Sequence, residues 1–215
     1  RNSIVIFCLV LFTLVTYRAV GQADFVYYDD QNYVTLNSHV HADLTLEGIA
    51  WAFTTFSKFN WHPVTWISYM ADFQLFGLNP AGFHWTNLVL HMANAALLFL
   101  VFQSMTNAFW PSVFIAALFA IHPLHVESVA WISERKDVLS AFFMFLALGA
   151  YTRYVRRGRK LNDYFLVILL FALGLMAKPM LVTLPIILLF TLKVAIQNFI
   201  KIKRIETRTI SKLHL

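Results

Sequence analysis

Phe25-Val26-Tyr27-Tyr28-Asp29-Asp30-Gln31-Asn32-Tyr33 begins the longest polar interval of the chain, just after its first long apolar run. Acidic residues are scarce, with 11 Asp and Glu among 215 residues, so two adjacent carboxylates between aromatic rings call for a reason. We interpret Asp29 and Asp30 as a functional pair that faces the external side of a membrane. The alternative is a turn or an aspartate cap on a helix after the first span, because aspartate is common at both positions.

The composition predicts a polytopic membrane protein. Apolar residues make up 59% of the chain and charged residues 13%, whereas about a quarter of the residues in a soluble domain are charged. Polar groups are therefore too few to cover the surface, and lipid must cover part of it. The single cysteine, Cys8, lies in the first apolar run, so neither a disulfide framework nor a thiolate metal site is expected.

The net charge of +6 does not indicate nucleic-acid binding. The basic residues are not spread over a soluble face but gather beside apolar runs, at Arg153 to Lys160 and at Lys193 to Arg208. Such clusters are typical of cytoplasmic loops that contact anionic headgroups.

Apolar runs predict about six transmembrane helices, which makes the expected fold all-α. The last stretch, 164–196, would be roughly 50 Å long as one helix at about 1.5 Å per residue, well beyond a bilayer core of about 30 Å. We therefore divide it at Lys178-Pro179 into two short spans, which also returns both basic clusters to the cytoplasm. A signal peptide is the alternative for the first run, but more membrane segments follow it instead of a soluble domain. The predicted spans are 3–20, 83–105, 108–121, 138–154, 164–177 and 180–197.

These spans and an external loop over 21–82 form one predicted transmembrane domain, 1–200, followed by a basic cytoplasmic tail, 201–215. Because the chain begins with Arg instead of Met and ends in that tail, we expect a fragment. In the external loop, Leu46 to Phe59 and Val64 to Phe76 are too short to span a membrane and are rich in Trp and Phe. This is typical of helices that lie in the membrane interface. The alternative is that they pack on protein.

The second predicted span carries a polar stripe. His84, Asn87, His91 and Asn94 follow a spacing that places them on one helical face. Polar groups at membrane depth face a wet cavity or form hydrogen bonds between helices, and both interpretations stay open.

Alternate crossings of the membrane place three polar regions on the same external face: Asp29-Asp30, the segment 122–137, and Lys178. This arrangement suggests chemistry on a lipid-linked anionic substrate. Transfer of a sugar from a polyprenyl phosphate requires a carboxylate within about 3 Å of the incoming hydroxyl, to accept its proton. It also requires cations or hydrogen-bond donors that stabilise the charge of the leaving lipid phosphate.

Candidates for both roles occur on this face. Asp29 or Asp30 is the candidate catalytic base. Structural alternatives are a helix end at His122-Pro123, a solvated helix cap at Glu134 to Asp137, and a Lys178 side chain that only reaches headgroups. A divalent metal is compatible with the acids and histidines, but their spacing is not diagnostic and no metal ligands are assigned. The candidate substrate-binding residues are His62, His84, His122, His125, Glu127, Arg135, Lys136 and Lys178.

Six strings occur in order along the chain: Tyr28-Asp29-Asp30, Asn60-Trp61-His62-Pro63-Val64-Thr65-Trp66, Gly77-Leu78-Asn79-Pro80-Ala81-Gly82-Phe83-His84, His122-Pro123-Leu124-His125-Val126-Glu127-Ser128-Val129-Ala130-Trp131, Glu134-Arg135-Lys136-Asp137 and Gly174-Leu175-Met176-Ala177-Lys178-Pro179. Together they resemble the membrane half of the bacterial relatives of the transmembrane and tetratricopeptide-repeat protein O-mannosyltransferases, in the GT-C glycosyltransferase superfamily. The resemblance runs from Asp24 to Ile196. No single string is specific, but the six in this order are.

The resemblance implies a GT-C-like fold, truncated here, whose first external loop carries the acidic catalytic motif, Asp29-Asp30. It also implies a polyprenyl-phosphate sugar donor, mannose as the sugar, a hydroxyl acceptor (in the eukaryotic relatives a protein Ser or Thr), and inversion at the sugar carbon. The helical repeats that usually follow, of about 34 residues each, do not occur in this sequence. The implied location is the bacterial inner membrane, or the endoplasmic reticulum for a eukaryotic chain.

Two other functions stay open on the sequence. A transporter or flippase-like protein would line a pathway with the intramembrane histidines and the break at Lys178, but the polar groups gather at one face and no inverted repeat is visible. A non-catalytic membrane scaffold would keep the fold without the chemistry. The leading prediction is a membrane glycosyltransferase whose partners are a polyprenyl-phosphate-linked sugar, a hydroxyl acceptor and the bilayer.

Overall fold

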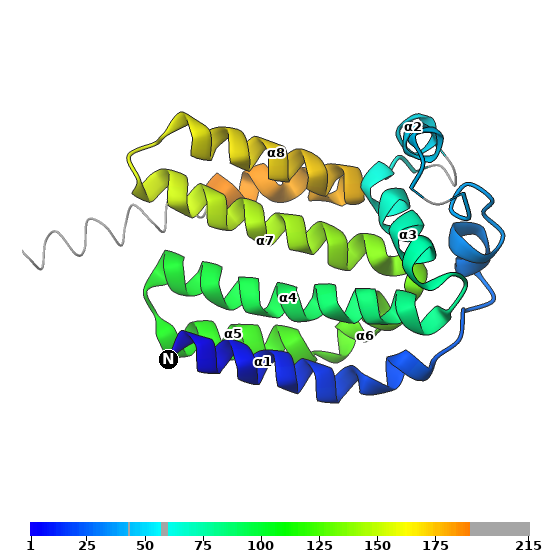
Figure 1. The fold of residues 1–215 in the computed structure, drawn as a ribbon. Helices are drawn as coiled ribbons and strands as arrows, with labels where there is room; N and C mark the ends of the chain where they lie inside the picture. Colours follow the sequence, from blue (N-terminus) through cyan, green and yellow to red (C-terminus); the bar gives the residue numbers. More distant parts are fainter. Residues whose placement is uncertain (43, 57–59, 190–215) are drawn as a thin grey trace, which may run out of the picture.

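The computed structural model describes residues 1–42, 44–56 and 60–189, and this part of the chain is helical without any strand. The long helices run side by side as a bundle, and the segment 179–189 folds back along α8 (Figure 1). The expected all-α fold is therefore confirmed. The long helices are α1 (Asn2–Tyr17), α4 (Pro80–Thr106), α5 (Phe109–Ile121), α7 (Arg135–Arg156) and α8 (Leu161–Ala177).

Three helical segments are long and apolar enough to cross a membrane: Asn2–Gln22, Pro80–Thr106 and Ile132–Arg156. The bent pair Phe109–Ile121 and Pro123–Ala130, with an angle of 51° between its helices, qualifies as a fourth, broken crossing. The chain is thus a polytopic membrane protein.

The last two apolar helices, Leu161–Ala177 and Pro179–Leu189, are shorter. This agrees with the prediction of two short segments that meet at Lys178-Pro179. The end of the predicted span 180–197 and the whole predicted tail 201–215 lie outside the described residues.

Two prolines determine where helices break at one end of the bundle. A proline pushes the preceding residue out of the α region and provides no backbone N–H of its own. His122 and Lys178 each precede a proline and have extended backbones, with ψ of 130° and 124°. Short 3-10 helices follow, η4 (Pro123–His125) and η6 (Pro179–Thr183). Both breaks therefore hold a polar side chain at the same end.

The bundle has two chemically different ends (Figure 1). One end, called here the loop end, contains residues 18–42, 44–56, 60–79, 121–137 and 177–179. The other end, called here the basic end, contains the N-terminus, the connection from α4 to α5 and the arginine-rich connection from α7 to α8. Asp29-Asp30, the segment 122–137 and Lys178 lie together at the loop end, as predicted, and the position of this end on the external side of a membrane stays a prediction.

The loop end has a hydrophobic core of its own. It is built by η2 (Gln31–Thr35), α2 (Leu46–Thr54), α3 (Pro63–Phe76) and the start of α4. Because α3 buries Trp66 and Met70 completely, the alternative interpretation, packing on protein, holds for this helix. In contrast, α2 leaves the side chain of Leu46 88% exposed, and its position in the membrane interface stays a prediction.

The polar stripe on α4 is buried and bonds neighbouring elements. Three of its side chains contact backbone carbonyl oxygens of the segments that follow α4, which favours hydrogen bonding between helices over a wet cavity. His84, the fourth, lies against the backbone of Asp24 and Ala130. The three contacts are Asn87 with Trp131 at 3.1 Å, His91 with Ala120 at 3.1 Å and Asn94 with Val138 at 2.8 Å.

Candidate functional site

Asp30 lies in the middle of the loop end and is fully buried. Its carboxylate accepts the backbone N–H of Ser133 at 2.9 Å and that of Val26 at 2.8 Å, and it also accepts the Ser133 hydroxyl. Three donors occupy most of the lone pairs of a carboxylate. Asp30 therefore fastens the first loop to the segment before α7, and it has no surface open to a substrate.

Asp29 has a different environment although it is the adjacent residue. Its side chain is partly exposed. Within the described part of the chain, no hydrogen bond or ion pair reaches its carboxylate. Of the predicted pair, Asp29 is therefore the carboxylate that a substrate hydroxyl can approach.

Tyr33 connects Asp29 with the start of α7. Burial raises the pKa of Tyr33 to about 12, and the negative charges of Asp29 and Glu134 add to the effect, whereas Lys178 opposes it. Lys136 Nζ also lies 5.1 Å from the centre of the Tyr33 ring. These charges thus surround one aromatic ring. We call the following residues the charged cluster: Asp29, Asp30, Tyr33, Glu134, Lys136, Asp137 and Lys178.

Two lysines of the charged cluster form ion pairs with two of its acids, Glu134 and Asp137. Lys178 Nζ pairs with Asp137 and lies 3.8 Å from Glu134 Oε2. Lys136 Nζ lies 2.9 Å from Glu134 Oε1 and donates a hydrogen bond to the Ser133 carbonyl at 3.2 Å. The Lys178 and Asp137 side chains are 26% and 30% exposed, so a ligand can reach them. These ion pairs argue against the interpretation that Lys178 only reaches headgroups.

A cavity of about 330 Å³ begins beside the Lys178–Asp137 pair, between α7 and the segment that follows Lys178. The spacing of its α7 residues places them on one helical face. A charged rim above an apolar wall suits an amphipathic molecule with an anionic head. The polar lining residues are Asp137, Ser140, Lys178 and Thr183, and the apolar ones are Ala141, Met144, Met180 and Leu181.

Arg135, which was predicted as a substrate-binding residue, does not belong to the exposed rim. Its side chain is fully buried and forms an ion pair with Asp72 of α3. It also donates to Asn87 Oδ1 and to the Phe83 carbonyl, both at 2.8 Å. Burial raises the pKa of Asp72, while Arg135 and the Thr86 hydroxyl oppose this. A guanidinium used in this way joins α3, α4 and α7 and has no free face for a ligand.

The predicted histidines do not form one pocket. His62 is buried against the rings of Tyr33 and Trp66, which also stack on each other. Burial together with the charge of Lys136 lowers the pKa of His62 to about 4, so it is neutral near pH 7. His62 therefore packs against Tyr33 of the charged cluster as a neutral, buried side chain.

His122 and His125 lie at the break after α5. His122 Nδ1 accepts the Leu124 backbone N–H at 3.2 Å, as expected for the helix-end alternative. The His125 ring packs on Phe119, with 4.5 Å between ring centres. Glu127 is exposed at the start of α6 (Val126–Ala130).

Across residues 1–42, 44–56 and 60–189, no group of three or more histidine, cysteine or acidic side chains is arranged to hold a metal ion. The structure also adds residues that the sequence analysis did not select: Tyr33, Ser133, Glu134 and Asp137. The sequence could have indicated Glu134 and Asp137, because residues three positions apart lie on the same face of a helical turn. No sequence pattern indicated the contacts that Tyr33 and Ser133 make.

The chain was compared with known proteins. No family model and no solved structure matches it. It is similar to Protein O-mannosyl-transferase Tmtc1 of Drosophila melanogaster, with 29% identity over 176 residues, which is 79% of this chain and 20% of that protein. Tmtc2 of the same organism is 28% identical over 70% of this chain and 17% of its own length. Human TMTC4 is 28% identical over 68% of this chain and 22% of its own length. The chain thus spans about a fifth of the length of these relatives.

Proposed function

We propose that this chain, a relative of the TMTC protein O-mannosyl-transferases, carries active-site residues of a membrane glycosyltransferase. The proposed reaction transfers mannose from a polyprenyl phosphate to a hydroxyl acceptor such as a Ser or Thr side chain of a protein. The loop end is proposed to face away from the cytosol, because clustered arginines favour the cytosolic side and occur at the basic end. The location proposed from the resemblance is a bacterial inner membrane.

Asp29 is the proposed catalytic base. The acceptor hydroxyl oxygen attacks the anomeric carbon of the sugar while its proton moves to the Asp29 carboxylate. The bond from that carbon to the phosphate oxygen breaks, and the polyprenyl phosphate leaves with the bonding electron pair. Attack from the side opposite the phosphate inverts the configuration. A base must be accessible to the hydroxyl, and Asp29 is partly exposed whereas Asp30 is buried.

Lys178 is the proposed contact for the donor phosphate. The observation that carries the proposal is the cavity that begins at the Lys178–Asp137 pair and continues along an apolar wall. A polyprenyl phosphate has the matching pattern, a charged head on a long apolar chain. A cation beside the leaving phosphate stabilises the charge that develops there. Lys136, on the other side of Glu134, is the second cation within the charged cluster.

Transfer of radiolabelled mannose from polyprenyl phosphate by the chain in membranes tests this proposal. Asp29→Asn keeps the size of the side chain but cannot accept a proton, so we expect transfer to fall by about 10²- to 10⁴-fold. Asp24→Asn is the matched control, because Asp24 is an exposed aspartate of the same loop. Transfer by Asp29→Asn at the wild-type rate would overturn the assignment of the base. A wild-type chain that transfers no mannose would favour the non-catalytic scaffold.

A further inference from the structure

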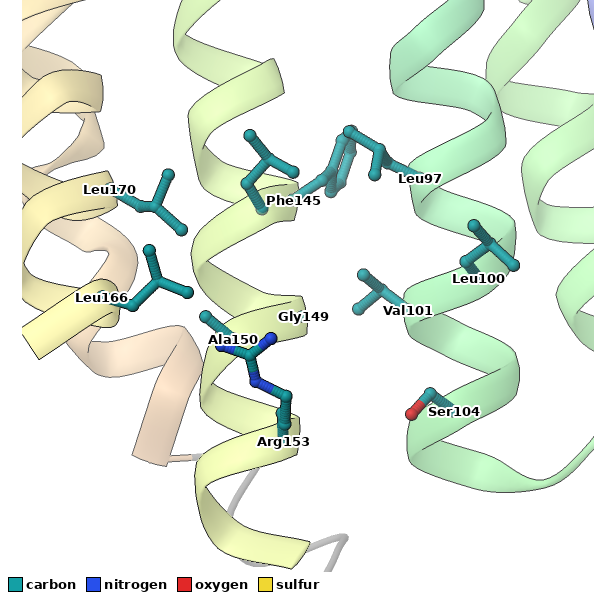
Figure 2. Close-up of a pocket in the computed structure, with 11 residues that line it drawn as sticks. Leu97, Leu100, Val101, Ser104, Phe145, Gly149, Ala150, Arg153, Leu166 and Leu170 are labelled. Atoms are coloured by element: carbon teal, nitrogen blue, oxygen red, sulfur yellow. The ribbon is translucent and has the colours of Figure 1, made fainter. Parts of the chain in front are cut away.

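A second cavity, of about 280 Å³, lies between α4, α7 and α8 (Figure 2). Nine of its eleven lining residues are apolar or glycine. The two exceptions, Ser104 and Arg153, lie together at the end toward which α4 ends and α8 begins (Figure 2). The apolar lining consists of Leu97, Leu100, Val101, Phe145, Leu146, Gly149, Ala150, Leu166 and Leu170.

The polar end of this cavity is positively charged. Arg153 Nε lies 2.7 Å from Asp163, and its side chain is still 42% exposed. Arg156 donates to the backbone carbonyl of Ser104, a residue that lines the cavity. Further cations follow in the connection to α8, namely Arg157, Arg159 and Lys160. Asp163 alone does not balance these charges.

This cavity is separate from the one beside Lys178. Asp137 and Arg153 are 16 positions apart on α7, which corresponds to about 24 Å along the helix axis. A lipid whose phosphate lies beside Lys178 therefore cannot place the same phosphate beside Arg153. The charged residues that line the two cavities, Arg153 and Lys178, thus lie toward opposite ends of the bundle.

We propose that the cavity between α4, α7 and α8 binds an anionic glycerophospholipid. One acyl chain lies among the leucines and Phe145, and the phosphate contacts Arg153 and Arg156. The apolar lining matches the chain, and the surplus of cations at the polar end matches an anionic head. Lipid is available beside this site, because the neighbouring face of α8 exposes Phe165 and Leu169.

Gly149 allows the cavity to be filled without a clash at the backbone. A Cβ atom added there would meet Val101 Cγ2 at 3.6 Å, an ordinary contact, so the rest of a leucine side chain must enter the cavity. Leucine also forms helices better than glycine, so Gly149→Leu is expected to remain folded. Val89→Leu is the matched control, since it adds bulk to an exposed position of α4 outside the cavity.

Lipid binding to the full chain in detergent, measured by native mass spectrometry, tests the proposal. Phosphatidylglycerol and phosphatidylcholine with the same acyl chains are compared. We expect the wild-type chain and Val89→Leu to bind phosphatidylglycerol about tenfold more tightly, because each basic residue near an anionic headgroup contributes to binding. Gly149→Leu should lose binding of both lipids. The double variant Arg153→Gln, Arg156→Gln should lose the preference and keep phosphatidylcholine binding.

Four results would overturn the proposal. The first is an equal affinity of the wild-type chain for both lipids, and the second is unchanged phosphatidylglycerol binding by Gly149→Leu. The third is displacement of phosphatidylglycerol by equimolar polyprenyl phosphate, which would assign the cavity to the donor lipid. Inorganic phosphate at millimolar concentration should not compete, because it lacks the acyl chain; competition by phosphate would show a simple anion site instead.

Discussion

The Asp30 carboxylate accepts both the backbone N–H and the hydroxyl of Ser133, a residue 103 positions later in the chain. This contact places the first loop against the start of α7. It also separates the roles of two adjacent aspartates. The Asp30 carboxylate is buried and accepts hydrogen bonds from the protein, whereas Asp29 stays accessible. Stability and activity should therefore respond differently to changes at these two positions.

Asp30→Ala should lower the free energy of unfolding by about 1–3 kcal/mol, because the substitution leaves the buried N–H of Ser133 and the partly buried N–H of Val26 without their acceptor. Asp29→Ala should change it by less than about 0.5 kcal/mol, as for most surface substitutions. Thermal unfolding in detergent measures both. Equal melting temperatures for the two variants would contradict the anchoring role of Asp30.

Lys178→Met should weaken donor binding while the fold persists. Lys178 is partly exposed, and ion pairs of this kind contribute only about 0–1 kcal/mol to stability. The expected result is a higher KM for the polyprenyl-phosphate donor, with partial recovery in Lys178→Arg, which restores the charge. Donor saturation curves measure this effect, with Lys160→Met at the opposite end of the bundle as a control. An unchanged KM would argue against the phosphate contact.

Arg135→Met should be strongly destabilising, because it leaves the Asp72 carboxylate buried without its cation. Loss of one partner of a buried ion pair costs about 3–5 kcal/mol. The double variant Arg135→Met, Asp72→Leu removes both charges and should recover part of that loss. Chemical denaturation of the wild-type chain, Arg135→Met, Asp72→Leu and the double variant measures this coupling. Additive losses in the double variant would show that the pair does not act as a unit.

The stability of the loop end should depend on pH through His62. Its pKa is about 4 in the folded protein and 6.5 without the protein environment. Because the lowered pKa means that the unfolded chain binds the proton more tightly, the free energy of unfolding should fall as the pH falls from about 6.5 to about 4. The change is about 3 kcal/mol at about 1.4 kcal/mol per pKa unit.

Above about pH 6.5 the contribution of His62 is fully present. Unfolding measured at pH 7 and at pH 4.5 should show a smaller difference in His62→Phe than in the wild-type chain. His39→Gln, which changes an exposed histidine of the same loop, should keep the wild-type difference. An equal pH dependence in His62→Phe and the wild-type chain would contradict the prediction.

Sequence reasoning located the candidate site but did not resolve its individual side chains. Hydrophobic run lengths and the charge bias were sufficient to bring Asp29-Asp30, the segment 122–137 and Lys178 to one end. They could not separate Arg135 from Lys136. Adjacent residues on a helix point about 100° apart, so one enters the core and the other reaches the rim, and only the tertiary packing decides which.

The same limit applies to α3. Its apolar residues surround the helix, so the pattern does not distinguish a protein neighbour from lipid. The structure shows that α3 packs against protein, because Trp66, Tyr69 and Met70 are all fully buried. In Leu46–Thr54, by contrast, the apolar side chains of Leu46 and Phe53 remain exposed, and the membrane interface is a suitable environment for them.

The proline that follows Lys178 has one more consequence. Since Pro179 stops the helix, the number of residues in α8 sets the angular phase at which the Lys178 ammonium group emerges. One inserted residue would turn it by about 100° and raise it by about 1.5 Å, away from Asp137. The length of a helix in a membrane protein is usually regarded as a match to bilayer thickness. Here the length of α8 also sets the direction in which the Lys178 side chain points.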